Sequence, residues 1–140
     1  MKYLVENVTR SSEQEMVDFL KTHENYTLFL LSNFVNFGVN LTQAPYSGNF
    51  KLIRCSSEVV AVFCLTRKGN LLIESSIIEP VFDKVLKACQ EELTPLQGLI
   101  GNWEFCEPFW EYLKDKKIIQ KELFISKEIL YKADLTKLPV

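Results

Sequence analysis

The segment from residue 50 to residue 74 constrains the fold most, because it contains three apolar runs separated by two turns. The runs are residues 50–55, 59–66 and 71–74, and the turns lie at Ser56-Ser57-Glu58 and Lys68-Gly69-Asn70. Short connections of this kind join antiparallel neighbours. The middle run is almost continuously apolar, which is typical of a strand covered on both faces. We therefore expect an antiparallel meander with residues 59–66 at its centre.

Helical periodicity precedes and follows this meander. A capping-box pattern of Ser12 and Glu15 predicts a first helix that ends near Thr22. A second helix is predicted to end at Gly38, which suits the C′ position. Because this second helix is apolar on nearly every side, we expect it to be a buried central element. After the meander, Pro80 lies in the first turn of a further helix with one apolar stripe.

The last third of the chain adds another strand and another helix. Residues 96–100 are a candidate parallel strand, and residues 103–116 form a helix with acidic residues early and lysines late, which suits the helix dipole. Residues 118–135 are rich in strand-forming side chains. The pattern predicts a single α/β (α+β) domain over residues 1–140. Its mixed, mostly antiparallel sheet is expected to have about five to seven strands and about four flanking helices.

Composition limits the expected partners and location. The chain has 140 residues, 47% of them hydrophobic, a net charge of −2 and a pI near 5.5. Binding to nucleic acid or to an anionic membrane needs a basic patch, so we expect neither partner. The chain has no apolar run long enough to span a bilayer and no signal-peptide core. We therefore expect a soluble, cytoplasmic protein.

Patterns that indicate catalysis or metal binding are sparse. His23 is the only imidazole, and we interpret it as a solvent-facing turn residue. The four cysteines lack CxxC spacing and lie among apolar neighbours, which predicts buried free thiols. Glu91 and Glu92 are adjacent on a helix and point apart, so we interpret them as a solvated face and not as an acid–base pair. No catalytic residue and no metal site is expected in this chain.

Residues 98–102, Gly-Leu-Ile-Gly-Asn, are the candidate ligand site. A strand that ends on glycine and opens a helix leaves free N–H groups that attract phosphate, so Gly98, Gly101 and Asn102 are candidate cofactor-binding residues. The segment lacks the GxGxxG and P-loop patterns, and Glu104 in the first helical turn would repel an anion. The alternative, which we favour, is a strand-to-helix turn capped by Asn102.

Aromatic residues are abundant, with ten Phe, five Tyr and two Trp. Phe105, Phe109 and Tyr112 share one face of the helix at residues 103–116, whereas Trp110 lies well around from them. Such a row either stacks a planar ligand or faces the core and leaves one ring at an interface. The second interpretation is the simpler one.

Three strings carry information beyond secondary structure. They are residues 23–34 (HENYTLFLLSNF), residues 59–63 (VVAVF) followed by residues 69–72 (GNLL), and residues 129–135 (ILYKADL). Between them, the GxxG segment at residues 98–101 opens a helix. Together with the element order, these strings resemble the N-terminal half of certain two-part acyltransferases of the GNAT superfamily. The resemblance covers essentially the whole chain.

The resemblance implies a degenerate, non-catalytic GNAT-like N-terminal domain. The superfamily's acetyl-CoA signature, Q/R-x-x-G-x-G/A, is absent, because Ile100 stands where its first glycine would follow Gln97. The resemblance therefore implies that acetyl-CoA binds a C-terminal catalytic acyltransferase domain beyond Val140, and that this chain alone binds no cofactor. Two alternatives stay open. One is a stand-alone protein-interaction domain, or a domain that forms a homodimer, with an aromatic interface. The other is a minimal enzyme that binds acyl-CoA at residues 98–102.

Overall fold

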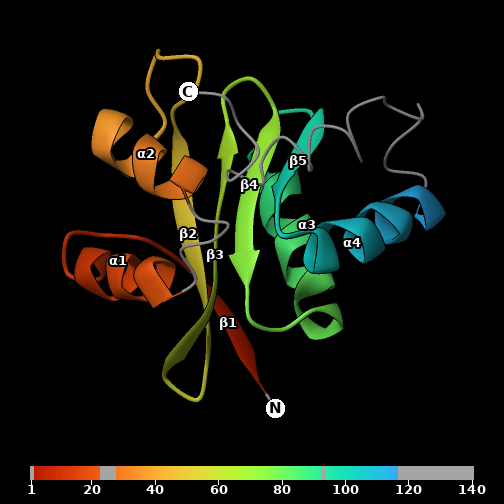
Figure 1. Ribbon diagram of the computed structural model, residues 1–140. Coiled ribbons are helices and arrows are strands. Elements are labelled where there is room, and N and C mark those ends of the chain that lie inside the picture. Colours follow the sequence, from red (N-terminus) through yellow and green to blue (C-terminus); the bar gives the residue numbers. More distant parts are fainter. Residues whose placement is uncertain (1, 23–27, 93, 117–140) are drawn as a thin grey trace.

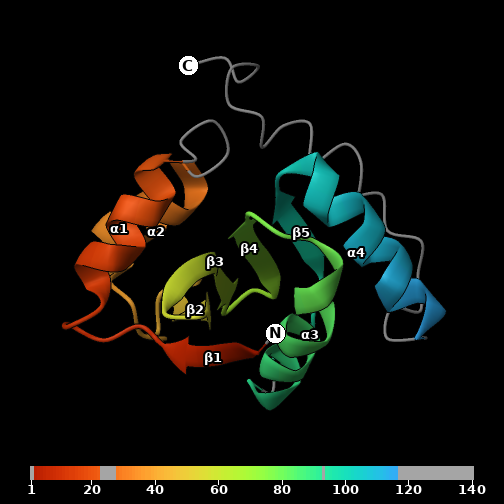
Figure 2. The same cartoon turned by 90° about the horizontal axis from the view of Figure 1, so that it is seen from below.

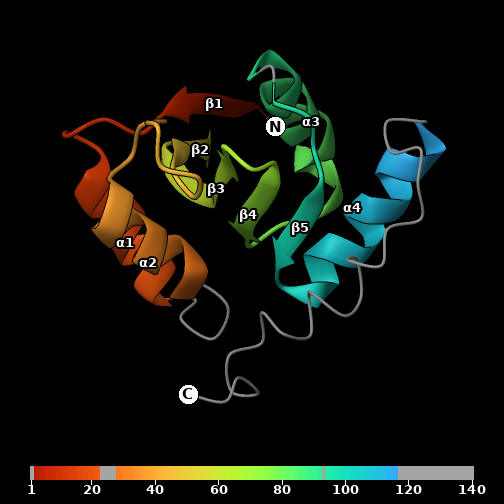
Figure 3. The ribbon, with the colours of Figure 1, turned by 90° about the horizontal axis from the view of Figure 1, so that it is seen from above.

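One mixed β-sheet and four α-helices make up the described part of the computed structural model, which covers residues 2–22, 28–92 and 94–116. Along the chain the elements are β1 (Tyr3–Asn7), α1 (Glu13–Thr22), α2 (Leu28–Phe37), β2 (Gly48–Cys55), β3 (Glu58–Thr66), β4 (Asn70–Ser75), the 3₁₀ turn η1 (Glu79–Val81), α3 (Phe82–Glu91), β5 (Gly98–Gly101) and α4 (Trp103–Asp115). Helices α1 and α2 lie on one side of the sheet, and α3 and α4 lie on the other (Figures 1 and 3).

The order of the five strands follows the chain, from β1 at one edge to β5 at the other. Strands β1 to β4 pair antiparallel, and β4 pairs with β5 in parallel. The central strand β3 is buried from Ala61 to Thr66, as expected for a strand covered on both faces. The predicted fold class, the meander and the short parallel strand are therefore confirmed.

The two hairpin turns hold this meander in register. Ser56 and Ser57 form the two-residue turn between β2 and β3, with φ values of 52° and 76°. Positive φ at both central residues matches the twist of the flanking strands. In the next turn, Gly69 has a φ of 94°, and a Cβ there would lie 2.4 Å from the carbonyl oxygen of Pro95. Only glycine lets the β3–β4 turn approach the segment that leads into β5.

Each face of the sheet has its own hydrophobic core (Figure 2). The core under α3 and α4 includes Phe63, Ile73 and Leu99 from the sheet, and the core under α1 and α2 includes Phe50 and Leu72. Successive residues of β4 alternate between these two cores, because side chains of a strand alternate between the faces of a sheet. The fold is thus a three-layer arrangement with two separate apolar interfaces.

Helix α2 is a surface element, and the prediction that it is buried centrally is wrong. Only Leu30 is fully buried among its side chains that the structure describes, and Val35 is 78% exposed. The helix ends as predicted, because Gly38 adopts a φ of 76° and its N–H bonds the carbonyl of Phe34. In a three-layer fold, a helix in an outer layer turns one side to solvent whatever its composition.

Strand β1 is an edge strand that the sequence did not predict. Four of its five residues are exposed, and the strand is tied to its neighbours by charge. The Arg54 guanidinium on β2 binds Glu6 of β1 with an Nε–Oε1 distance of 2.9 Å, and it also binds Glu15 of α1 with an Nη2–Oε1 distance of 2.6 Å. The Arg54 side chain holds the pKa of Glu15 below its ordinary value, mainly through this hydrogen bond.

The predicted N-cap of α4 is confirmed, whereas the predicted capping box of α1 forms only in part. Asn102 caps α4, since its Oδ1 accepts the N–H of Glu104 at 2.8 Å. Ser12 precedes α1 as predicted, but its Oγ accepts the N–H of Thr9 at 2.9 Å, and Glu15 bonds Arg54 in place of the reciprocal capping-box contact. His23 and the strand-rich residues 118–135 lie outside the described residues.

Candidate functional site

The predicted ligand segment forms strand β5 and the start of α4. Gly98 and Gly101 are the two ends of β5, and Asn102 is the N-cap residue of α4. A Cβ on Gly101 would lie 2.3 Å from the carbonyl oxygen of Ile73 on β4. Glycine at this position therefore allows β5 to approach β4 closely, which is a packing role.

The first turn of α4 offers little to an anion. The N–H groups of Phe105 and Cys106 both bond the carbonyl of Asn102, and the N–H of Glu104 is taken by the Asn102 side chain. Anion sites at helix N-termini depend on free N–H groups and on the absence of nearby negative charge. Here the Glu104 carboxylate and the nearby carboxyl of Glu74 interact with each other electrostatically. These residues do not fit a pyrophosphate group, and we derive no cofactor chemistry from them.

Glu74 is the one titratable group near this segment that the sequence prediction overlooked. It is 2% exposed, and its Oε1 atom has no hydrogen-bond partner. Burial, followed by the neighbouring Glu104 charge, raises the pKa of Glu74 to about 7. Glu74 lies two residues after Leu72 on β4, so its side chain is on the same face as Leu72, the face under α1 and α2. The only sequence signal was a single carboxylate at the end of an apolar strand.

The cysteine side chains provide no activated nucleophile. Cys55, Cys64, Cys89 and Cys106 are all buried free thiols, as predicted. Burial raises the pKa of Cys64 and of Cys89 to about 12, and it raises the pKa of Cys106 further still. Because the thiolate is the reactive form, such thiols are inert in the folded state.

No group of three or more potential metal ligands occurs among residues 2–22, 28–92 and 94–116. The same ranges contain no helix long and apolar enough to cross a membrane.

The two carboxylates that were predicted to form a solvated face have different environments in the structure. Glu91 is exposed, but Glu92 is turned to the sheet, where it binds Lys51 at 3.1 Å and accepts a hydrogen bond from Asn49 at 3.0 Å. The prediction is therefore wrong for Glu92.

The aromatic row of α4 faces the core. Phe105 and Phe109 are buried, and their rings pack against Phe82 of α3 with centroid distances of 5.3 and 5.2 Å. Trp110, which was placed away from the row, is also only 4% exposed. Tyr112, the third member of the row, and Trp103 are only partly buried and pack at the edge of this core. The row on α4 therefore faces the core, as the simpler interpretation had it.

A groove of about 420 Å³ lies between α2 and the sheet. Phe29 and Phe37 of α2 and Tyr46 of the following loop form one side, and Leu72 of β4 and Ile100 of β5 belong to the other. None of its ten lining residues is charged. Tyr46 in the lining is 50% accessible, and Val35, which lies on the same helix outside the lining, is 78% accessible. We name the groove together with Val35 the α2 surface.

Amide side chains line the α2 surface but are partly occupied. Asn33 donates to the carbonyl of Tyr46, and Asn36 donates to the Ser32 hydroxyl at 3.3 Å. The first contact holds the loop after α2 against the helix, and the second lies within the helix. The combination of apolar side chains with a few amides is typical of protein interfaces and is poorly suited to acid–base chemistry.

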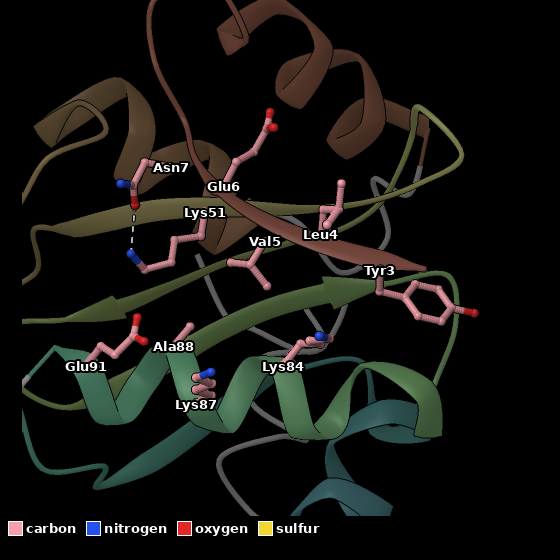
Figure 4. A pocket seen from close by; sticks show the side chains of 10 residues that line it. All are labelled: Tyr3, Leu4, Val5, Glu6, Asn7, Lys51, Lys84, Lys87, Ala88 and Glu91. Carbon is pink, nitrogen blue, oxygen red and sulfur yellow. Dashed lines mark hydrogen bonds between the residues drawn. The ribbon is translucent and has the colours of Figure 1, made fainter. Parts of the chain in front are cut away.

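A second groove, of about 370 Å³, lies on the other side of the sheet between β1 and α3 (Figure 4). Lys51, Lys84, Lys87, Glu6 and Glu91 contribute charge to its lining. We name it the β1–α3 groove. The two grooves therefore differ in chemistry, since one is neutral and the other is charged.

Comparisons with protein-family models, with curated proteins and with solved structures found no match for this chain. The α/β fold and the two grooves are what the molecule itself offers for a functional assignment.

Proposed function

We propose that this chain is a non-catalytic N-terminal module of a GNAT-type, acetyl-CoA-dependent N-acetyltransferase, and that it packs against a catalytic half through the α2 surface. The observation that carries the proposal is the exposure of an apolar helix. Val35 is 78% accessible on a helix whose ten residues are Leu, Phe, Val, Ser and Asn. An exposed apolar side chain on a helix that also borders an uncharged groove supports an interaction role for this helix.

Two further features support the proposal. The described elements occur in the order on which the resemblance rests: two helices, a three-stranded meander, a helix, a parallel strand and a helix. The cysteines and the α4 terminus offer neither a nucleophile nor a phosphate cradle, which favours a docking role over catalysis. In this proposal acetyl-CoA binds the catalytic half, and the two-part enzyme works in the cytoplasm.

The coding sequence provides the first test. The proposal predicts that the reading frame continues past Val140 into a strand followed by R/Q-x-x-G-x-G/A. A stop codon directly after Val140 would contradict a two-part enzyme encoded as one chain.

The second test uses the two-part protein that this reading frame encodes. Val35→Asp places a charge on the α2 surface, and we expect it to separate the halves, which limited proteolysis between them would report as faster cleavage. Ile78→Asp is the matched control, because Ile78 is 38% exposed but precedes α3 on the opposite face. Equal rates of cleavage in the two variants would contradict docking through the α2 surface. In the chain alone, Val35→Asp is expected to change the free energy of unfolding by less than about 0.5 kcal/mol.

A homodimer formed through the same α2 surface is the second candidate, because two copies can cover each other's apolar side chains. Analytical ultracentrifugation of this chain separates it from the first. A dimer that dissociates on Val35→Asp favours self-association, and a monomer at high micromolar concentration counts against it.

A further inference from the structure

The β1–α3 groove combines an open sheet edge with a helix face that carries Lys84, Lys87 and Glu91 (Figure 4). Figure 4 shows Val5 pointing from β1 toward α3, where Ala88 lies between Lys84, Lys87 and Glu91. Ala88 is small and buried, so it leaves space beside the strand. Leu4 and Glu6 point to the opposite side of β1.

Among the described residues, the outer edge of β1 faces no neighbouring strand, so backbone groups on that side have no ladder partner there. The N–H of Val8 bonds the carbonyl of Phe50 at 2.9 Å, and the pairing places Asn7 opposite Lys51. Because bonded and non-bonded pairs alternate in an antiparallel ladder, Leu4 and Glu6 are bonded to β2. The N–H and carbonyl groups of Val5 and Asn7 therefore point outward.

Two of the usual protections against strand addition, a proline and a β-bulge, are absent from β1, and its one charged side chain, Glu6, is paired with Arg54. Leu4 is 55% exposed and Val5 is 36% exposed. An exposed apolar edge with free N–H and carbonyl groups is a template for a further strand.

The charged side chains beside β1 indicate which residues an added strand should carry. Lys51 is occupied, because it donates to Asn7 at 2.8 Å and binds Glu92 at 3.1 Å. Lys84 and Lys87 are exposed, and in the part of the chain that the structure describes neither forms an ion pair. They lie three residues apart on α3 and so share one face of that helix.

We propose that the β1–α3 groove binds an extended acidic peptide segment of a partner protein, which adds to the sheet beside β1. In an added strand, alternate side chains face α3, and acidic residues at these positions meet Lys84 and Lys87. The residues between them lie on the other face beside Leu4, where an apolar side chain gains a cross-strand contact. The recognised pattern is acidic–apolar–acidic, and this site is independent of the α2 surface.

A second copy of this chain fits the groove less well than an acidic segment. The β1 side chains on the α3 side are Tyr3, Val5 and Asn7, which are uncharged. Pairing β1 with β1 of another molecule would therefore leave Lys84 and Lys87 without counter-charges. The two lysines, which form no ion pair within the described residues, favour an acidic partner at their end of the groove, and Glu91 lies at the other end (Figure 4).

The experiment titrates the chain with a capped eight-residue peptide in which glutamate and valine alternate, and follows fluorescence anisotropy together with the amide resonances of Val5 and Asn7. We expect saturable binding with shifts at these two amides, weakened several-fold when salt rises from about 50 to about 300 mM. A peptide with lysine in place of glutamate is the probe control and is expected not to bind.

Two variants separate the contributions of charge and backbone. Lys84→Glu combined with Lys87→Glu changes only exposed side chains and is expected to weaken binding about tenfold. Val5→Pro removes an outward N–H without removing a bond to β2, and it is expected to abolish binding while circular dichroism and the melting temperature stay near those of the parent chain.

Three results overturn the proposal. The first is equal binding of the lysine and glutamate peptides, and the second is unchanged glutamate-peptide binding in the charge-reversed variant. The third is a peptide-independent dimer that sediments as a monomer after Val5→Pro, which assigns the edge to a second copy. Should Val5→Pro fail to fold, the charge-reversed variant still decides between the outcomes.

Discussion

The α2 surface and the β1–α3 groove lie on opposite faces of one sheet and differ in the chemical groups that they offer to a partner. The α2 surface offers uncharged side chains, led by the exposed Val35, and its backbone is already bonded within a helix. The β1–α3 groove offers free backbone groups on Val5 and Asn7 with lysines beside them. The first gains affinity from burial of apolar area, and the second from hydrogen bonds and charge.

Under the two proposals, one small domain would bind two partners at separate surfaces without competition. Salt should weaken binding at the β1–α3 groove and leave binding at the α2 surface nearly unchanged, because screening acts on charges and not on apolar contacts. A docking module between a catalytic half and a further protein needs such separation.

The largest effect is expected from Gly101→Ala, whose Cβ would face Cys106 in the core under α3 and α4 and would also disturb the β5 wall of the α2 groove. A Cβ at this position would lie 2.3 Å from the Ile73 carbonyl, so β5 must move away from β4 and shift the Ile100 wall of the groove. We expect a loss of about 3 kcal/mol or more in the free energy of unfolding, measured by urea denaturation. Gly38→Ala is the control, since its Cβ meets nothing within 4 Å and costs only about 1 kcal/mol for the positive φ. Equal losses would contradict the close approach of β4 and β5.

The next effect tests the edge of the other groove through two adjacent prolines. Leu4→Pro removes an N–H that bonds β2 and is expected to cost about 2–3 kcal/mol. Val5→Pro removes an outward N–H and is expected to cost less than about 1 kcal/mol. Urea denaturation of both variants checks the ranking. The reverse ranking would mean that the outward groups of β1 are assigned to the wrong residues.

A smaller and pH-dependent effect is expected at Glu74, which belongs to the α2 side. Its pKa of about 7 in the folded state lies above the ordinary value of 4.5, so the folded state holds a proton that the unfolded chain has released between these values. The stability from the protonated carboxyl is present below about pH 4.5 and is lost as the pH rises to about 7. Glu74→Gln keeps the side chain neutral, and at pH 8 it is expected to raise the free energy of unfolding by roughly 1–3 kcal/mol.

Thermal melts of both proteins at pH 4.5 and pH 8 measure this dependence. We expect the Glu74→Gln curve to lie above the parent curve at pH 8 and to meet it near pH 4.5. A parent protein whose stability rises from pH 4.5 to pH 7 while the variant stays level would contradict the buried, unpaired state of Glu74.

Much of the fold could be predicted from local sequence signals, because turns and helix caps depend on a few neighbouring residues. The Ser56-Ser57 turn, the Gly69 turn and the Asn102 cap are each found where the sequence indicates them. Helix α2 was misplaced because its composition states how apolar it is but not which layer it occupies.

The two grooves were beyond prediction for a different reason. Val5 on β1 and Lys84 on α3 meet only through the tertiary fold, and β1 itself was missed because its residues are mostly exposed and lack the pattern of a half-buried strand. Glu92 turned inward to Lys51, a contact that spacing on the helix cannot reveal. The burial of Glu74 likewise depends on which face of β4 is covered.

The central claim, that this chain is a docking module without a cofactor site of its own, is tested most directly by titrating it with acetyl-CoA and recording the amide resonances of Gly98, Gly101 and Asn102. The account predicts no saturable shift at millimolar acetyl-CoA, because the N–H groups at the start of α4 are engaged by Asn102 and lie beside Glu104. Saturable shifts centred on these three residues would contradict it and would make the chain an acyl-CoA-binding enzyme in its own right.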